Sequence, residues 1–351
     1  MGKRIMIMAG GTGGHVFPAL AVALYLREQG WQVNWIGTRQ GIENRVVPEN
    51  GIVMDWLSIS GLRGKGRLAM IKAPLMLLQA CLQAASILHK RRPDIALGMG
   101  GFVAGPGGLM ARLLGIPLII HEQNRIPGTT NRLLARLAKV VLQAFPYTFP
   151  EKLQAICTGN PLRQEFAGVC KSKPPSAEKD LKVLVVGGSQ GAKVLNEIVP
   201  EALSHVPAVK VRHQTGTSMW QQVKKHYQKL AVDAEVSDFI IDMVAAYQWA
   251  DLVICRAGAM TLSEIAAMGL PSILIPFPYA IDDHQTANGR FLQQAGASIL
   301  IPEKQLQAAG LAKQVVYLQN NLAVMSQAAR RCARPEATQQ VAKICAAEAG
   351  L

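Results

Sequence analysis

The sequence predicts an α/β protein made of two doubly wound domains, each with a parallel sheet. Apolar strands repeatedly run into glycine-rich turns that open helices, at residues 4–16, 94–109 and 252–268. The pattern restarts with a strand predicted at residues 181–186, and a Gly-Gly-x-x-Gly turn and a helix follow it. A length of 351 residues also fits two domains of ordinary size.

Composition and cysteine usage limit the class of protein. Half of the residues are hydrophobic, but no run of about 18 apolar residues occurs, so we expect no transmembrane helix. The N-terminal apolar run is short and enters a glycine turn, which predicts a first strand and not a signal peptide. Six scattered cysteines without Cys-x-x-Cys spacing indicate reduced thiols in the cytoplasm and argue against a disulfide framework or structural zinc.

Positive charge is concentrated in the N-terminal half. The net charge is +14, and residues 1–160 carry 18 basic against 7 acidic side chains. This half is therefore expected to meet an anionic partner, and nucleic acid, an anionic membrane surface and a phosphorylated substrate all have the right sign. A merely basic, solvated surface is the alternative. The absence of an aromatic-interleaved basic stripe or a recognition motif argues against nucleic acid.

The first glycine turn, Gly10 to His15, follows a strand predicted at residues 4–9 and precedes a helix predicted at residues 16–29. Valine at position 16 breaks the G-x-G-x-x-G pattern and no G-K-[ST] follows, so neither a standard dinucleotide site nor a P-loop is indicated. His15 comes at the carboxyl end of the first strand, where ligands of such sheets bind. The helix dipole there favours a neutral imidazole, which suits a general base; a loop-capping histidine is the alternative.

A basic, glycine-rich loop at residues 59–67 leads into an apolar helix predicted at residues 70–88. Apolar residues cover more than one face of this helix, and basic residues flank both of its ends. Such a composition is typical of a helix exposed to lipid head groups, although a core helix with a basic C-terminal cap has the same pattern.

A glycine-rich loop at residues 100–108 and the strand after it predict further ligand positions. Such glycine density usually means that the backbone passes close to something bulky or charged. The strand predicted at residues 118–120 delivers four polar residues, His121 to Asn124. We expect Glu122 and Asn124 to face a ligand just past its carboxyl end, and Glu122 is the second candidate for a general base.

A segment rich in Pro, Lys, Ser and Ala at residues 145–180 predicts a linker. The expected domains are residues 1–162 and 163–335, with a C-terminal helix at residues 336–351 that packs back on the first domain. From residue 306 onward the sequence predicts two amphipathic helices, broken at Pro335.

In the second domain, the helix starts are the expected anion sites. A glycine turn at residues 187–191 opens one helix, and Thr261 to Glu264 form a capping-box pattern that opens another. Glu264 could instead accept hydrogen bonds from a sugar diol. Asp282, Asp283 and His284 have no partner cluster with metal spacing, so we predict no metal site.

Taken together, eight segments resemble the MurG glycosyltransferase family, whose members are peripheral membrane enzymes of bacterial wall synthesis. The resemblance runs from about residue 3 to beyond residue 290, and the segments are highly specific as a set. They are GGTGGH at 10–15, ISGLRGKG at 59–66, GMGGFVAGPGG at 98–108, HEQN at 121–124, GNPLR at 159–163, GGSQGA at 187–192, CRAGAMTLSEIAAMGLP at 255–271 and DDHQTAN at 282–288.

The resemblance implies a GT-B fold, in which two Rossmann-like domains face a central cleft. It also implies an inverting transfer of N-acetylglucosamine from UDP-N-acetylglucosamine to the 4-hydroxyl of undecaprenyl-diphosphate muramyl-pentapeptide, without a cofactor. The enzyme is then expected on the cytoplasmic face of the bacterial inner membrane, bound peripherally to its anionic surface.

The resemblance implies roles for individual residues as well. Glu264 would bind the ribose, the backbone of Ile240 would contact uracil, and the Gly188–Gly191 turn would hold the diphosphate. Met260 stands where the family has leucine. The other implied contacts are Thr12, Gly13, Gly14 and His15 on the acceptor side, and Asn124, Arg163, Ser189, Gln190, Ala259, Met260, Thr261, Leu262, Ser263, Gln285 and Asn288 on the donor side.

Rival interpretations remain open at this stage. Another GT-B enzyme, either a diacylglycerol glycosyltransferase or a UDP-N-acetylglucosamine 2-epimerase, would share the fold, and an epimerase would need no acceptor lipid. A basic nucleotide- or nucleic-acid-binding protein without catalysis belongs to a different class, and steeply salt-sensitive DNA binding would support it.

Overall fold

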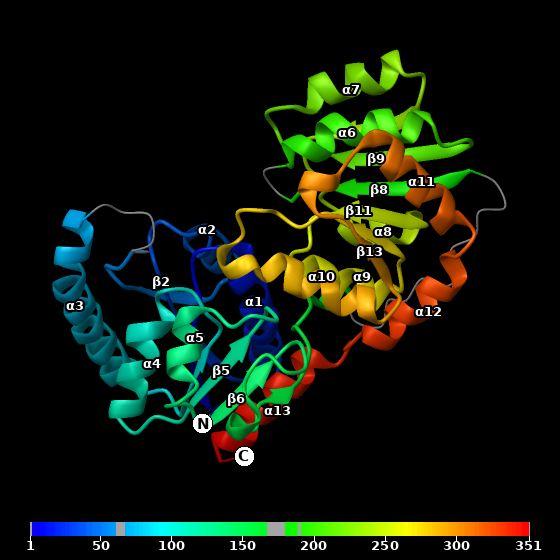
Figure 1. Cartoon of the computed structure of the whole chain (residues 1–351). Helices are drawn as coiled ribbons and strands as arrows, with labels where there is room; N and C mark the ends of the chain where they lie inside the picture. Colours follow the sequence, from blue (N-terminus) through cyan, green and yellow to red (C-terminus); the bar gives the residue numbers. More distant parts are fainter. Residues whose placement is uncertain (1, 61–66, 167–179, 189–190, 351) are drawn as a thin grey trace. The chain divides into compact units, whose positions relative to one another are not determined.

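The computed structural model describes residues 2–60, 67–166, 180–188 and 191–350 (Figure 1). The chain divides into two compact units. The first comprises Met1–Gln164 and Pro335–Leu351, and the second comprises Glu165–Arg334. Each unit is a parallel sheet with helices on both faces, as the sequence predicts.

The first unit contains a seven-stranded parallel sheet in the order β3-β2-β1-β4-β5-β6-β7. The chain changes direction between β1 and β4, which makes this pair the switch point of the sheet, where ligands of such folds bind. The strands are β1 (Arg4–Met8), β2 (Gln32–Gly37), β3 (Val53–Trp56), β4 (Ile95–Gly98), β5 (Leu118–Glu122), β6 (Val140–Gln143) and β7 (Ile156–Cys157).

Alternation along β1 separates two hydrophobic layers. Ile5 and Ile7 face the layer that contains α1 and α13, whereas Met6 and Met8 face the layer that contains α3, α4 and α5 (Figure 1). The helices are α1 (Gly13–Glu28), α2 (Glu43–Glu49), α3 (Arg67–Arg91), α4 (Ala104–Leu113), α5 (Thr129–Leu134) and α13 (Ala337–Glu348), with the 3-10 turns η1 (Glu151–Leu153) and η2 (Gln164–Phe166). No helix in the described ranges is long and apolar enough to cross a membrane.

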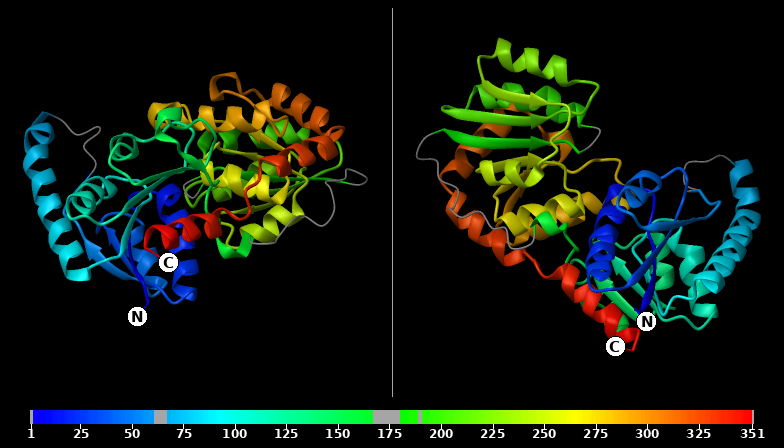
Figure 2. Two further views of the ribbon diagram at one scale, coloured as in Figure 1. Left: turned by 90° about the horizontal axis from the view of Figure 1, so that it is seen from below. Right: turned by 180° about the vertical axis from the view of Figure 1, so that it is seen from behind.

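The last helix, α13, is part of the first unit. Val341, Ala342 and Cys345 are buried against α1 and the sheet. The Lys3 ammonium donates to the Ala349 carbonyl at 2.6 Å, which ties the start of the chain to the end of this helix (Figure 2). These contacts explain why the chain returns to the first unit after Arg334.

The second unit contains a six-stranded parallel sheet in the order β10-β9-β8-β11-β12-β13. Its switch point lies between β8 and β11, so the order repeats that of the first sheet. Its strands are β8 (Leu181–Val186), β9 (Val209–Gln214), β10 (Asp233–Ser237), β11 (Leu252–Cys255), β12 (Ser272–Leu274) and β13 (Ser298–Leu300). Its helices are α6 (Lys193–Ser204), α7 (Trp220–Lys229), α8 (Met243–Trp249), α9 (Ala259–Met268), α10 (His284–Gln294), α11 (Ala308–Gln319) and α12 (Leu322–Cys332), with the 3-10 turns η3 (Ile281–Asp283) and η4 (Glu303–Gln305).

Two helix expectations are wrong. The segment after residue 306 forms three helices, because α11 ends at Gln319 and the Asn321 side chain donates to the Tyr317 carbonyl at its end. The capping-box prediction fails because α9 already begins at Ala259 with Gly258 as its N-cap. Glu264 therefore lies beyond the first turn of α9, too far from its start to cap it.

Candidate functional site

In the first unit, two glycine turns at the switch point lie against each other. A Cβ atom on Gly101 would come within 2.3 Å of the Gly10 carbonyl oxygen, and a Cβ on Gly100 within 2.7 Å of His15 Nδ1. Both residues also have positive φ, at 78° and 99°. The glycine density around residue 100 therefore serves close packing against the protein's own first turn.

Two buried side chains anchor the first glycine turn, and neither was recognised in the sequence. The Trp35 indole N–H donates to the Ala9 carbonyl at 2.9 Å. The fully buried carboxylate of Glu43 accepts from the Gly11 N–H at 3.0 Å and from the Thr38 hydroxyl at 2.8 Å. No sequence pattern around Trp35 or Glu43 indicates this role, because their partners Ala9 and Gly11 are far away in the sequence.

His15 lies in the first turn of α1 and is half-buried. Its Nδ1 atom is 2.9 Å from Gln123 Oε1, which arrives directly after β5. Thr12 is the N-cap residue of α1, and its carbonyl accepts from the His15 N–H at 3.1 Å. Gly13 and Gly14 are the first two residues of the helix, so their N–H groups point out of its positive end.

Glu122, the other base candidate, is 1 % exposed, and donors surround its carboxylate. Oε1 accepts from the Asn124 N–H at 3.0 Å and from the Asn124 side-chain amide at 3.4 Å. Oε2 accepts from the Gly128 N–H at 3.1 Å and from the Asn131 amide at 2.9 Å. This carboxylate organises the loop after β5, and Asn124 takes part in the same network. Arg163, the remaining predicted residue of this unit, is half-buried in the segment between β7 and η2.

In the second unit, the segment after β8 brings two glycines with positive φ close to other backbone. Gly188 and Gly191 have φ values of 90° and 74°, and a Cβ on Gly191 would overlap the Thr215 carbonyl oxygen at 1.8 Å. Helices α6 and α9 begin after the adjacent strands β8 and β11, and neither has an acidic residue in its first turn. Their positive ends are therefore not neutralised locally. Ser189 and Gln190 lie outside the described residues.

Gln214 links Gly188, after β8, to Ile240, and no pattern in the sequence marks this role. It is the last residue of β9, lies opposite Val186 and is 3 % exposed. Its amide N–H donates to the Gly188 carbonyl at 2.9 Å, and its Oε1 accepts from the Ile240 N–H at 3.0 Å. The Ile240 N–H is thus already bonded, so a nucleobase that contacts the Ile240 backbone must use its carbonyl or displace Gln214.

Within α9, the predicted residues divide by burial. Ala259 and Leu262 are buried, so only their backbone could meet a ligand. Half-buried Glu264 accepts from the Tyr247 hydroxyl at 3.1 Å, which orients its carboxylate. The other three, Met260, Thr261 and Ser263, are half-buried, and the Ser263 hydroxyl donates to the Ala259 carbonyl at 2.9 Å.

Arg256 and α10 fix the loop after β12. The Arg256 guanidinium donates to the Ile275 and Pro276 carbonyls, both at 3.2 Å, and pairs with Glu303 at 2.6 Å. Gln285 accepts from the Phe277 N–H at 2.9 Å. The predicted contact Asn288 has no exposed surface and donates to the Ala257 carbonyl, so it positions the turn before α9.

No group of three or more His, Cys, Asp or Glu side chains with metal-binding geometry occurs among the residues that the structure describes.

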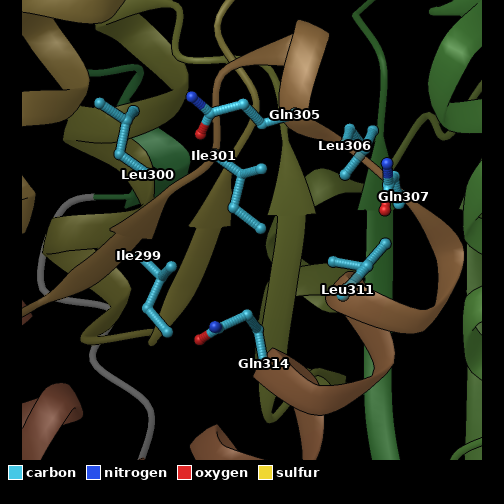
Figure 3. Close-up of a pocket in the computed structure, with 9 residues that line it drawn as sticks. Ile299, Leu300, Ile301, Gln305, Leu306, Gln307, Leu311 and Gln314 are labelled. Atoms are coloured by element: carbon cyan, nitrogen blue, oxygen red, sulfur yellow. The ribbon is translucent and has the colours of Figure 1, made fainter.

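The second unit also holds a cavity of about 270 Å³ beside β13 and α11 (Figure 3). Aliphatic and amide side chains line this cavity, with no charged group to meet a phosphate, and no predicted site residue is among them. The lining is Ile299, Leu300, Ile301, Gln305, Leu306, Gln307, Gly310, Leu311 and Gln314.

Comparison with known proteins agrees with this architecture over the full length. A protein of Methylococcus capsulatus named UDP-N-acetylglucosamine–N-acetylmuramyl-(pentapeptide) pyrophosphoryl-undecaprenol N-acetylglucosamine transferase is 59% identical over 355 residues, which is 100% of both chains. The crystal structure of Acinetobacter baumannii MurG is 41% identical, with a TM-score of 0.85 over 98% of this chain and 99% of that one. A UDP-GlcNAc 2-epimerase from Neisseria meningitidis shares only the fold, at 14% identity and a TM-score of 0.65 over 97% and 98% of the chains.

Family assignment follows from both units. Residues 5–143 match the glycosyltransferase family 28 N-terminal domain, and residues 182–344 match the glycosyltransferase family 28 C-terminal domain. The first match covers the strands β1 to β6, and the second covers the strands β8 to β13 and extends into α13. The chain belongs to glycosyltransferase family 28, as a UDP-N-acetylglucosamine-dependent transferase.

Proposed function

We propose that this enzyme transfers N-acetylglucosamine from UDP-N-acetylglucosamine to the 4-hydroxyl of undecaprenyl-diphosphate muramyl-pentapeptide, with inversion at the anomeric carbon. The observation that carries the proposal is the 59% identity, end to end, with a transferase named for this donor and this acceptor. The epimerase alternative has only a likeness of fold at 14% identity, which does not extend to its reaction.

The donor half of the reaction fits the second unit. The uncompensated N-termini of α6 and α9 can stabilise the diphosphate as negative charge develops on it. Glu264, oriented by Tyr247, presents a carboxylate oxygen that can accept from both hydroxyls of a ribose. Gln214 holds Gly188, where we place the diphosphate, and Ile240, where we place uracil, at a fixed spacing. Recognition of a nucleoside diphosphate requires such a fixed spacing.

For the proton transfer, the geometry favours His15 over Glu122. Four donor contacts already occupy both oxygens of Glu122, and its side chain has almost no exposed surface. The His15 ring uses Nδ1 in the contact with Gln123, which leaves Nε2 for the substrate. The acceptor oxygen attacks the anomeric carbon as the bond to the UDP oxygen breaks, and the hydroxyl proton passes to Nε2.

Helix α3 fits a peripheral membrane contact at the cytoplasmic face of the inner membrane. Leu75, Leu78 and Leu82 follow helical spacing on one side of α3 and are 71%, 57% and 64% exposed. Lys90 and Arg92 are exposed at its C-terminal end, while Arg91 is held by Asp55 at 2.8 and 3.0 Å. Exposed leucines beside basic residues are the composition of an interfacial helix. In the basic segment before this helix and at its start, Lys65 lies outside the described residues, as do the side chains of Arg67 and Lys72.

The reaction itself is tested by transfer of labelled N-acetylglucosamine from UDP to a lipid-diphosphate muramyl-pentapeptide in the presence of EDTA. We expect labelled lipid, because helix N-termini and backbone N–H groups can neutralise the leaving diphosphate. Formation of UDP-N-acetylmannosamine, or of free N-acetylmannosamine by hydrolysis of its bond to UDP, without any lipid product would instead identify an epimerase. If transfer occurs only after magnesium is restored, helix N-termini and backbone N–H groups alone do not neutralise the leaving diphosphate.

Replacing Gln214 by leucine tests the link within the donor site. We expect the Kd for UDP-N-acetylglucosamine, measured by calorimetry, to rise at least about fivefold, because two hydrogen bonds of about 1 kcal/mol each hold the binding segments. The exposed Gln228 on α7 supplies the control Gln228→Leu, which should leave the Kd unchanged. An unchanged Kd in the Gln214 variant would show that the link does not matter for the donor.

His15→Ala and Glu122→Gln separate the two base candidates. Loss of His15 should lower kcat by about 10²–10⁴-fold, the usual contribution of a general base, with little change in donor affinity. Glu122→Gln should instead lower the free energy of unfolding by about 1–3 kcal/mol, because a glutamine amide cannot accept from all the buried donors. Steady-state kinetics and urea unfolding give both values. Near-normal turnover of the His15 variant would return the base role to Glu122.

Replacing Leu75, Leu78 and Leu82 together by glutamine tests the membrane contact. We expect binding to vesicles that contain phosphatidylglycerol to fall at least about tenfold, since full burial of one leucine contributes about 1.5–3 kcal/mol. Affinity for UDP-N-acetylglucosamine should stay the same. Val324 on α12, which is 70% exposed, gives the matched control Val324→Gln. If the triple variant sediments with vesicles as well as the parent does, the contact lies elsewhere.

A further inference from the structure

A row of hydrogen bonds connects His15 to the interior of the first unit. His15 Nδ1 is 2.9 Å from Gln123 Oε1, and Gln123 Nε2 is 3.2 Å from His121 Nδ1. His121 Nε2 is in turn 2.9 Å from the Gly159 carbonyl oxygen. Each link has one donor and one acceptor, so fixing the proton at one end fixes every proton in the row.

The inner end of the row is fixed by a carbonyl group. The Gly159 oxygen can only accept, so His121 Nε2 must carry a proton. His121 has no exposed surface, and its burial lowers its pKa to about 4, so the ring is neutral near pH 7. A neutral imidazole has a single N–H, and His121 Nδ1 is therefore an acceptor.

The orientation of the Gln123 amide follows from this. One end of the amide faces two acceptors, His121 Nδ1 and the His121 carbonyl oxygen, each at 3.2 Å. Only the NH₂ group can serve both, since it has two protons to donate. The opposite end, which faces His15, is consequently the amide oxygen. Gln123 is 1 % exposed, so no solvent stands in for either partner.

We propose that Gln123 is a positioning residue that sets the tautomer of His15, with the proton on Nδ1 and the lone pair on Nε2. The amide oxygen can only accept, so His15 Nδ1 must donate to it. The inference rests on the proposed role of His15 as the base. In the reaction, the O–H bond of the acceptor hydroxyl breaks, and its proton forms a bond to His15 Nε2. The hydrogen bond from Nδ1–H to Gln123 is kept.

Gly100 keeps the ring in contact with Gln123. A Cβ at position 100 would lie 2.7 Å from His15 Nδ1 and 2.9 Å from Cε1, so any side chain there would push the imidazole away from the amide. The glycine run and the polar motif that follows β5 thus act on the same atom. A neutral amide orients the ring without the full charge that a carboxylate would place beside it.

The tautomer can be read directly in the full-length protein labelled with ¹⁵N-histidine. Long-range ¹H–¹⁵N spectra at about pH 9, where imidazoles are neutral, distinguish a protonated from a bare ring nitrogen. The His15 signals are those lost in His15→Ala. We expect His15 to have a protonated Nδ1 and a bare Nε2. Protonation of Nε2 as the major form in the parent protein would overturn the proposal.

Variants at position 123 separate positioning from simple structural support. Gln123→Leu removes the acceptor, so His15 should shift toward the Nε2-protonated form, and kcat should fall by roughly 10–100-fold with the KM for the donor unchanged. Gln123→Glu keeps an acceptor opposite Nδ1 and should retain the tautomer of the parent, while the loss of the donor to His121 should lower its free energy of unfolding. An unchanged tautomer in Gln123→Leu contradicts the proposal.

Gln143→Leu is the matched control. Gln143 is also a buried glutamine of this unit, and its amide bridges the Ala155 carbonyl and the Phe149 N–H. Its loss should leave the His15 tautomer as it is. The spectra need no substrate, so they decide the tautomer even if His15→Ala keeps its turnover, in which case only the assignment of the base fails.

Discussion

Parallel strands must be joined by crossovers, and this constraint determines where the polar residues of each unit lie. In each sheet the chain first adds strands on one side of the first strand, β1 or β8, and then crosses over to add strands on its other side. The loops that follow adjacent strands therefore converge at one edge of the sheet. Residues far apart in sequence then come within hydrogen-bonding distance. His15 and Gln123 are 108 positions apart, and Gln214 lies 26 positions from both Gly188 and Ile240.

Convergence has two consequences for the side chains at these edges. Backbones approach so closely that Gly101 and Gly191 have no room for a Cβ. Polar groups also lose contact with water, and each one left unpaired would cost about 1–3 kcal/mol. Glu43 and Glu122 meet that need by accepting from backbone N–H groups of the loops. A residue that looks like a ligand-binding group in the sequence can therefore have its hydrogen-bonding capacity used by the protein's own loops.

The sequence was sufficient for the fold class but not for every helix start. The strand at Leu181–Val186 was predicted with its observed bounds, because an apolar run between two turn signals leaves little freedom. Helix α1 begins at Gly13 and α4 at Ala104, three and five residues before the starts that the sequence predicts, at residues 16 and 109. Both helices begin inside glycine turns, where propensity rules expect loop.

The candidate site was predictable in position and not in hydrogen bonding. That ligands meet the carboxyl ends of the strands follows from topology, and His15 comes after β1 as predicted, whereas β5 extends through Glu122, which was expected just past its end. Which of the two is available to a substrate depends on partners such as Asn131 and Gln123. Gln123 and Gln214 share a chemical reason for being amides, since each must donate at one end and accept at the other. A carboxylate at position 214 could not donate to the Gly188 carbonyl, and it would also place negative charge beside the helix starts that favour a diphosphate.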